Sequence, residues 1–87
     1  MLFIGADNRL WCAESDGTRL TLAYLENYSK TWSTRQTIAT GDFTQPSAVD
    51  RGDGEIVIRA VNNSDGLSYQ FRTRDGGAHV TPDGVIS

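Results

Sequence analysis

The fold of this chain is decided in residues 55–61, which read Glu-Ile-Val-Ile-Arg-Ala-Val and lie between two Asp-Gly pairs. The run is rich in β-branched residues, and alternation places Ile56, Ile58 and Ala60 on one side of an extended strand. Valines occupy the other side as well, which indicates a strand that is covered on both faces. The Asp-Gly pairs predict turns, because glycine tolerates positive φ and aspartate bonds its own local backbone.

The rest of the chain continues this pattern of short strands and turns. Five of the nine glycines directly follow an aspartate, and these pairs are spread so that no long helix fits between them. Residues 19–25 and 67–73 alternate in the same way as residues 55–61. The sequence therefore predicts an all-β meander with strands near residues 2–5, 9–14, 19–25, 31–39, 47–50, 55–61, 67–73 and 79–81, and a turn at 82–84.

Composition excludes several classes of function. A length of 87 residues predicts one structural unit, and eleven acidic against eight basic side chains give a net charge of −3. A nucleic-acid-binding module would normally show a clustered basic face, so no nucleic-acid partner is expected. The apolar runs are too short for a transmembrane helix, so no membrane partner is expected either. One cysteine and one histidine offer no internal disulfide or zinc cluster, and we expect no metal and no cofactor.

Two segments of the chain are similar to each other. Residues 25–32 follow one predicted strand and residues 73–80 follow another, and superposing them places Asn27 on Asp75. The chain thus reads as a single unit, 1–87, that contains two four-stranded repeats, 1–45 and 46–87. Four strands that recur every roughly 40 to 50 residues are typical of β-propeller blades.

Both segments resemble the Asp-box, or bacterial neuraminidase repeat, which reads Ser-x-Asp-x-Gly-x-Thr-Trp. The first segment keeps Thr31 and Trp32, and the second keeps Thr73, Asp75 and Gly77. The resemblance, which extends to the blades of propeller lectins, implies that each box lies on the turn between the third and fourth strands of a blade.

The residues of the box suggest a role in folding. A carboxylate or amide at Asn27 and Asp75 can bond free backbone N–H groups of a tight turn. The glycine at Gly77 permits a backbone conformation that is costly for other residues. Trp32 is expected to pack under its hairpin as a plug.

Two blades are fewer than the four or more of known propellers, so two apolar faces would remain uncovered. We expect identical chains to associate head to tail into a ring. A trimer is favoured by analogy with trimeric lectins of about this length, which the chain resembles in plan. Residues 84–87 fall short of a full fourth strand, which predicts that an N-terminal strand completes a neighbouring blade. A fragment of a larger propeller and an unrelated small sandwich or barrel remain alternatives.

Carbohydrate binding is the predicted function, because sugars are recognised by aromatic rings together with paired polar groups. Packing is the competing explanation for the aromatic candidates, as a plug for Trp32 and as core for the others. Seven arginines show no spacing that singles out the triad of a sialidase, so no catalytic residues and no enzyme activity are expected. The alternatives are a structural or interaction module of a virion or surface protein and a fragment of a sialidase-like propeller. The candidate ligand-binding residues are Trp11, Trp32, Tyr24, Tyr69, Arg59 and Arg72.

Overall fold

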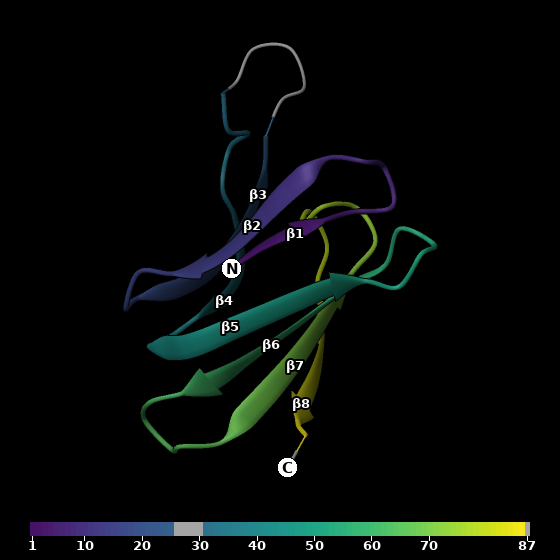
Figure 1. The fold of residues 1–87 in the computed structure, drawn as a ribbon. Coiled ribbons are helices and arrows are strands. Elements are labelled where there is room, and N and C mark those ends of the chain that lie inside the picture. The colour runs from purple at the N-terminus through teal and green to yellow at the C-terminus, as the bar shows by residue number, and fades with distance from the viewer. Residues whose placement is uncertain (26–30, 87) are drawn as a thin grey trace.

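Two antiparallel sheets, each built from strands that are consecutive in the sequence, make up the computed structural model (Figure 1). The structure describes residues 1–25 and 31–86, and within them it contains eight strands and no helix, so no helix there could cross a membrane. Sheet 1 consists of β1 (Leu2–Ile4), β2 (Leu10–Ser15), β3 (Arg19–Tyr24) and β4 (Gln36–Thr40). Sheet 2 consists of β5 (Phe43–Asp50), β6 (Ile56–Asn62), β7 (Ser68–Thr73) and β8 (Thr81–Val85). The prediction of an all-β meander is confirmed.

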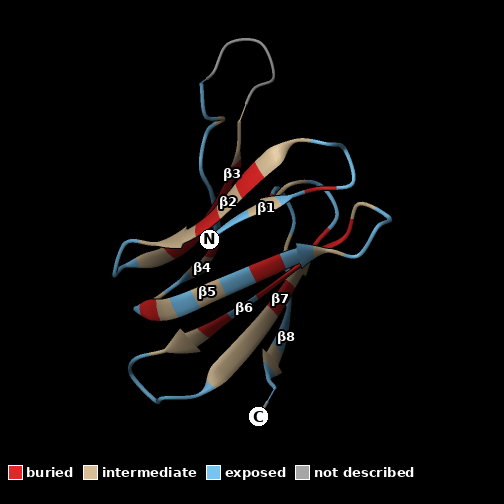
Figure 2. Cartoon of the chain, viewed as in Figure 1, coloured by how far each residue is buried: buried red, intermediate tan, exposed pale blue. Residues whose placement is uncertain are grey.

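The two sheets pack face to face, with β5 against the first three strands of sheet 1 (Figure 1). Alternation along each strand sends every second side chain into the space between the sheets. Leu20, Leu22 and Ile58 are fully buried there, whereas pale blue positions in Figure 2 mark exposed residues along β1 and β5. The core contains Trp11, Ala13, Leu20, Leu22 and Ile38 from sheet 1 and Phe43, Ala48, Ile56, Ile58, Ala60 and Phe71 from sheet 2.

Aspartates close several of the hairpins. The Asp16 carboxylate accepts hydrogen bonds from the N–H groups of Thr18 and Arg19, both at 2.9 Å. These bonds favour the ionised form and hold the pKa of Asp16 well below its usual value. The glycine that follows, Gly17, has a φ of 89° and so completes a turn that other residues adopt at a cost.

The last strand differs from the prediction. Residues 82–84, expected as a turn, lie inside β8, where Gly84 pairs with Gln70 and Pro82 with Phe71. β8 is an edge strand, and edge strands tolerate proline. The pairing of β7 with β8 shifts in register between the Gln70–Gly84 and Phe71–Pro82 pairs, and this irregularity accommodates the positive φ of Gly84. Sheet 2 therefore has its own fourth strand. The expectation that the C-terminal residues fall short of a full fourth strand is wrong.

Two further boundaries differ from the sequence-based expectation. β4 begins at Gln36 rather than near residue 31, and β5 begins at Phe43 rather than near residue 47. β5 continues through Pro46 because the strand lies at the edge of sheet 2, where proline is tolerated. A β-bulge between Thr44 and Ser47, in which Gln45 has a φ of 52°, shifts the pairing with β6 at this point. The strand therefore spans the repeat boundary that was predicted between residues 45 and 46.

Candidate functional site

A cleft of about 800 Å³ opens between the two sheets, at the end where the β1–β2, β3–β4, β5–β6 and β7–β8 loops meet. Sheet 1 contributes Trp11 and Tyr24 from paired positions on β2 and β3, and Trp32 from the segment that precedes β4. Sheet 2 contributes Ile56 at the start of β6 and Arg74 after β7. The cleft thus combines aromatic side chains of sheet 1 with charged side chains from both sheets.

Aromatic rings form the sheet 1 wall of the cleft. The rings of Trp11 and Tyr24 lie 5.0 Å apart at 54°, and the Arg9 guanidinium lies 4.5 Å from the centre of the Tyr24 ring. This arrangement holds a cation over an aromatic face. Gly5 makes room for the wall, because a Cβ added there would lie 2.6 Å from the Trp11 indole nitrogen.

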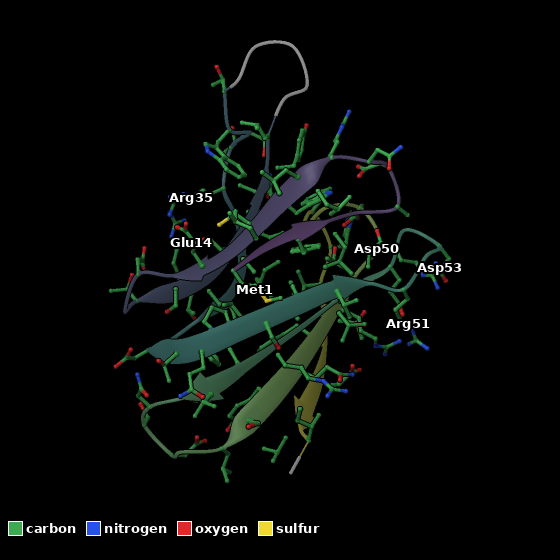
Figure 3. The ribbon with its side chains drawn as sticks, in the orientation of Figure 1. Met1, Glu14, Arg35, Asp50, Arg51 and Asp53 are labelled. Atoms are coloured by element: carbon green, nitrogen blue, oxygen red, sulfur yellow. The ribbon has the colours of Figure 1, made fainter. Side chains whose placement is uncertain are left out.

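Two carboxylates fix the loops beside this wall. Asp7 accepts hydrogen bonds from the backbone N–H of Arg9 at 3.0 Å and from Trp11 Nε1 at 3.2 Å. Asp50, labelled in Figure 3 at the end of β5, accepts the backbone N–H of Ala6 at 2.9 Å and that of Gly52 at 2.8 Å. Since Ala6 belongs to sheet 1's first loop, Asp50 ties the two sheets together at the edge of the cleft.

The opposite wall is the β7–β8 turn, which contains Asp75 and Gly77 of the predicted Asp-box. The backbone N–H of His79 donates to the Asp75 carboxylate at 2.8 Å, which lowers the pKa of Asp75 to about 2, and the His79 ring acts in the same direction. The Thr73 hydroxyl accepts the N–H of Gly77 at 2.9 Å. Gly77 has a φ of 104°, and a Cβ added there would lie 2.7 Å from Gln36 Cβ. This turn therefore packs directly against the start of β4.

Trp32 is more exposed than a plug would be. It keeps 43% of its surface exposed, and its backbone forms a bridge with Leu25 just beyond β3. The expected packing of this ring under its hairpin is therefore not what the structure has. A half-exposed indole at the rim of a cleft is instead available to a ligand.

Three of the six candidate ligand-binding residues, Trp11, Tyr24 and Trp32, come together in this cleft, and the other three lie elsewhere. Arg59 lies on the outer side of sheet 2, where its Nε donates to Gln70 at 2.9 Å. Tyr69 donates its hydroxyl proton to Asp65 and packs edge-on against Phe43. Arg72 lies beside Glu55 and Asp83. Asn27, the turn residue proposed for the first repeat, lies outside the described residues.

Three arginines converge on one carboxylate next to the cleft. Glu55, with 9% of its side chain exposed, lies 3.3 Å from Arg51, 3.4 Å from Arg74 and 3.9 Å from Arg72. Arg72 also pairs with both oxygens of Asp83, which raises the pKa of Arg72 and lowers that of Asp83. Spacing in the sequence did not single out these arginines. These three arginines form an ion-pair network around Glu55.

Asp7 and Arg9 are among the cleft residues that the sequence did not indicate. They belong to a loop between two strands, and their place beside Tyr24 depends on the pairing of β2 with β3. Alternation in the strands does reveal that Trp11 and Tyr24 share a face, but it carries no information on a loop side chain.

The described residues contain no group of three or more His, Cys, Asp or Glu side chains that could hold a metal ion. The chain matches no protein-family model, no curated protein and no solved structure.

Proposed function

We propose that this chain is a carbohydrate-binding, lectin-like module and that the cleft between its two sheets is the sugar site. The observation that supports this most directly is the convergence of Trp11, Tyr24 and Trp32 with Asp7 and Arg9 on one cleft. Sugars present C–H faces that pack on aromatic rings and hydroxyl groups that bond charged side chains in pairs.

The depth and polarity of the cleft suit such a ligand. Its volume of about 800 Å³ lies in the range of small-molecule sites. Carboxylates accept and guanidinium groups donate hydrogen bonds, so Asp7 and Arg9 together can satisfy both the donors and the acceptors of neighbouring sugar hydroxyls. Their backbone and side-chain contacts hold them in place before a ligand arrives, which limits the entropy lost on binding.

The module is, on this proposal, a pair of β-propeller blades of the Asp-box type, and identical chains complete a ring, most simply as a trimer. The consecutive strand order of each sheet and the Thr73, Asp75 and Gly77 contacts in the β7–β8 turn support this architecture. Exposed apolar side chains, among them Leu2 and Val49, support association between copies.

Glycan-array binding followed by titration calorimetry with the best-bound sugar tests the proposal. Tyr24→Leu and Trp32→Ala should each weaken binding by at least about tenfold, which corresponds to 1.4 kcal/mol. Tyr69→Leu is the matched control, because Tyr69 lies outside the cleft and should leave affinity unchanged. Absence of binding to every glycan by the folded wild-type protein would contradict the proposal.

A structural or interaction module is the second candidate, and the exposed apolar residues Leu2, Ile4 and Val49 favour it. Assembly without glycan binding would support this alternative. A sialidase-like fragment predicts turnover of a fluorogenic sialoside by the wild-type protein, whereas the lectin proposal predicts none.

A further inference from the structure

Each sheet has two faces, and the strand register defines which residues share a face. We name each face after one residue of its second strand. Rows of paired residues give the Cys12 face (Leu2, Cys12, Ala23) and the Trp11 face (Phe3, Trp11, Tyr24) in sheet 1, and the Ile58 face (Ala48, Ile58, Phe71) and the Val57 face (Val49, Val57, Arg72) in sheet 2.

Inside the chain, the Trp11 face of sheet 1 packs against the Ile58 face of sheet 2. Trp11 and Ile58 belong to the same buried cluster, and Phe3 and Tyr24 pack against that cluster. The Cys12 face and the Val57 face therefore point away from the sheet–sheet contact.

Backbone hydrogen bonds show which faces of the two sheets are equivalent. On β2, the Leu10 carbonyl accepts the N–H of Leu25 at 2.8 Å, and on β6, Asn62 donates to the Leu67 carbonyl at 2.9 Å. Both bonds point toward the third strand of their sheet. Residues two apart in a strand share this direction and share a face.

For L-residues, the direction of the backbone groups determines the face on which the side chain lies. The backbone groups of Cys12 and Ile58 both point to the third strand, so the Cys12 face and the Ile58 face are the same face of two equivalent units. The Trp11 face and the Val57 face are equivalent for the same reason. The two sheets thus pack head to tail, with opposite faces in contact.

The chain consequently leaves one face of each kind without a second sheet packed on it, although Val57 and Ala23 on these faces are themselves buried. The Cys12 face exposes Leu2 by 58% and Ile4 by 63%, and the Val57 face exposes Val49 by 57%. Within the chain, the Trp11 face packs on the Ile58 face. The Val57 face is equivalent to the first of these and the Cys12 face to the second, so the two remaining faces are complementary surfaces. We propose that the Val57 face of one copy docks on the Cys12 face of a second copy, in the geometry that the two sheets have within one chain.

Charge at the two faces is complementary in this arrangement. If Cys12 corresponds to Ile58, then Glu14 corresponds to Ala60 and Arg59 to Ala13. These two alanines belong to the same buried cluster between the sheets, so the same geometry between copies would place Arg59 and Glu14 on the two facing sides of the contact. Glu14 lies 3.1 Å from Arg35 on sheet 1 (Figure 3), whereas within the described part of the chain Arg59 has an uncharged partner, the Gln70 amide. A carboxylate from the next copy would supply the missing counter-charge.

A head-to-tail contact repeats until the rotation closes, so it makes a ring rather than a two-fold dimer. Trp32 is the sugar-site residue that also lies beside Leu2, Cys12 and Ala23 of the Cys12 face. The inference rests on the proposed ring of blades, and its test, the mass of the assembly, is separate from glycan binding. Glycan binding and assembly can therefore fail separately, and each failure is recognisable.

Charge-swap variants measured by multi-angle light scattering test the contact. Wild-type protein should have a ring mass, about 28 kDa for three copies of 9.5 kDa, that does not grow with concentration. Arg59→Glu and Glu14→Arg should each lower the mass about threefold, to that of one chain, and the chain that carries both changes should recover the ring. Asp65→Arg, a charge reversal of the same kind in the β6–β7 loop, should leave the mass unchanged. Circular dichroism verifies that each variant keeps its sheets.

Other masses would contradict the docking of the two faces or the pairing of Arg59 with Glu14. A wild-type monomer, or a mass of two chains that indicates pairing of identical faces, would overturn the docking proposal. Single variants that retain the ring, or a double variant that stays monomeric with intact sheets, would overturn the pairing of Arg59 with Glu14.

Discussion

Replacement of Gly77 by alanine should destabilise the protein more than the same change at Gly52. Both glycines have a positive φ, 104° at Gly77 and 95° at Gly52, so alanine should cost of order 1–3 kcal/mol at either position from backbone strain alone. The positions differ in their surroundings. A Cβ at Gly77 would lie 2.7 Å from Gln36 Cβ, whereas a Cβ at Gly52 would meet nothing within 4 Å.

Carbon atoms normally approach to about 3.5–4.0 Å, so the contact at Gly77 forces the β7–β8 turn away from β4. Overpacking of this kind typically costs about 1–3 kcal/mol. The free energy of unfolding should therefore fall by about 2–6 kcal/mol for Gly77→Ala and by about 1–3 kcal/mol for Gly52→Ala.

Urea unfolding followed by tryptophan fluorescence measures both values, because Trp11 is only 6% exposed and reports on the sheet–sheet contact. The two variants should be compared at one protein concentration, since association adds to apparent stability. Equal losses at the two positions would refute the claim that the turn packs closely on β4.

Two other predictions follow from burial and from the aspartate turns. Leu22 is fully buried, so Leu22→Ala should lower the free energy of unfolding by about 2–5 kcal/mol. Leu67 is 41% exposed, so Leu67→Ala should change this free energy by at most about 0.5 kcal/mol, and thermal melting distinguishes the two variants. The folded-state pKa of Asp75 is lowered from 3.8 to about 2, so its stabilising contribution is present above about pH 4 and is lost as the pH falls through the folded-state pKa. The urea midpoint should therefore decrease between about pH 4 and pH 2, and Asp75→Asn should make this decrease smaller; an unchanged acid profile in the variant would argue against the assignment.

The strands were predictable from the sequence because their side-chain pattern is local. Alternation in residues 19–25 and 55–61 identifies strands that the structure places in sheets 1 and 2. The extent of β8 was wrongly predicted, as a strand that ends near residue 81, because Pro82 and Gly84 favour turns when considered alone. Their strand conformation depends on pairing with β7 and on the bonds that Asp83 makes to Gln70 and Arg72, which no local pattern reveals.

The cleft was predictable only in part. The shared strand face of Trp11 and Tyr24 follows from period-two alternation once β2 and β3 are paired. Arg9 is placed by a loop and by its contact with Tyr24, and Arg74 by ion pairs with Asp53 and Glu55. Such positions depend on tertiary structure, so the sequence alone provides no signal for them.

Every strand in residues 1–25 and 31–86 pairs with its immediate neighbours in the sequence, and none of these strands crosses from one sheet to the other. The connection at Gly41 and Asp42 can therefore be cut, or the coding segment beyond it duplicated, without separating any hydrogen-bonded strand pair. In-frame duplication of such a gene would join successive units covalently, and the junctions between polypeptides would become ordinary loops. Evolution could in this way convert the proposed assembly, which depends on concentration, into one that forms on a single polypeptide.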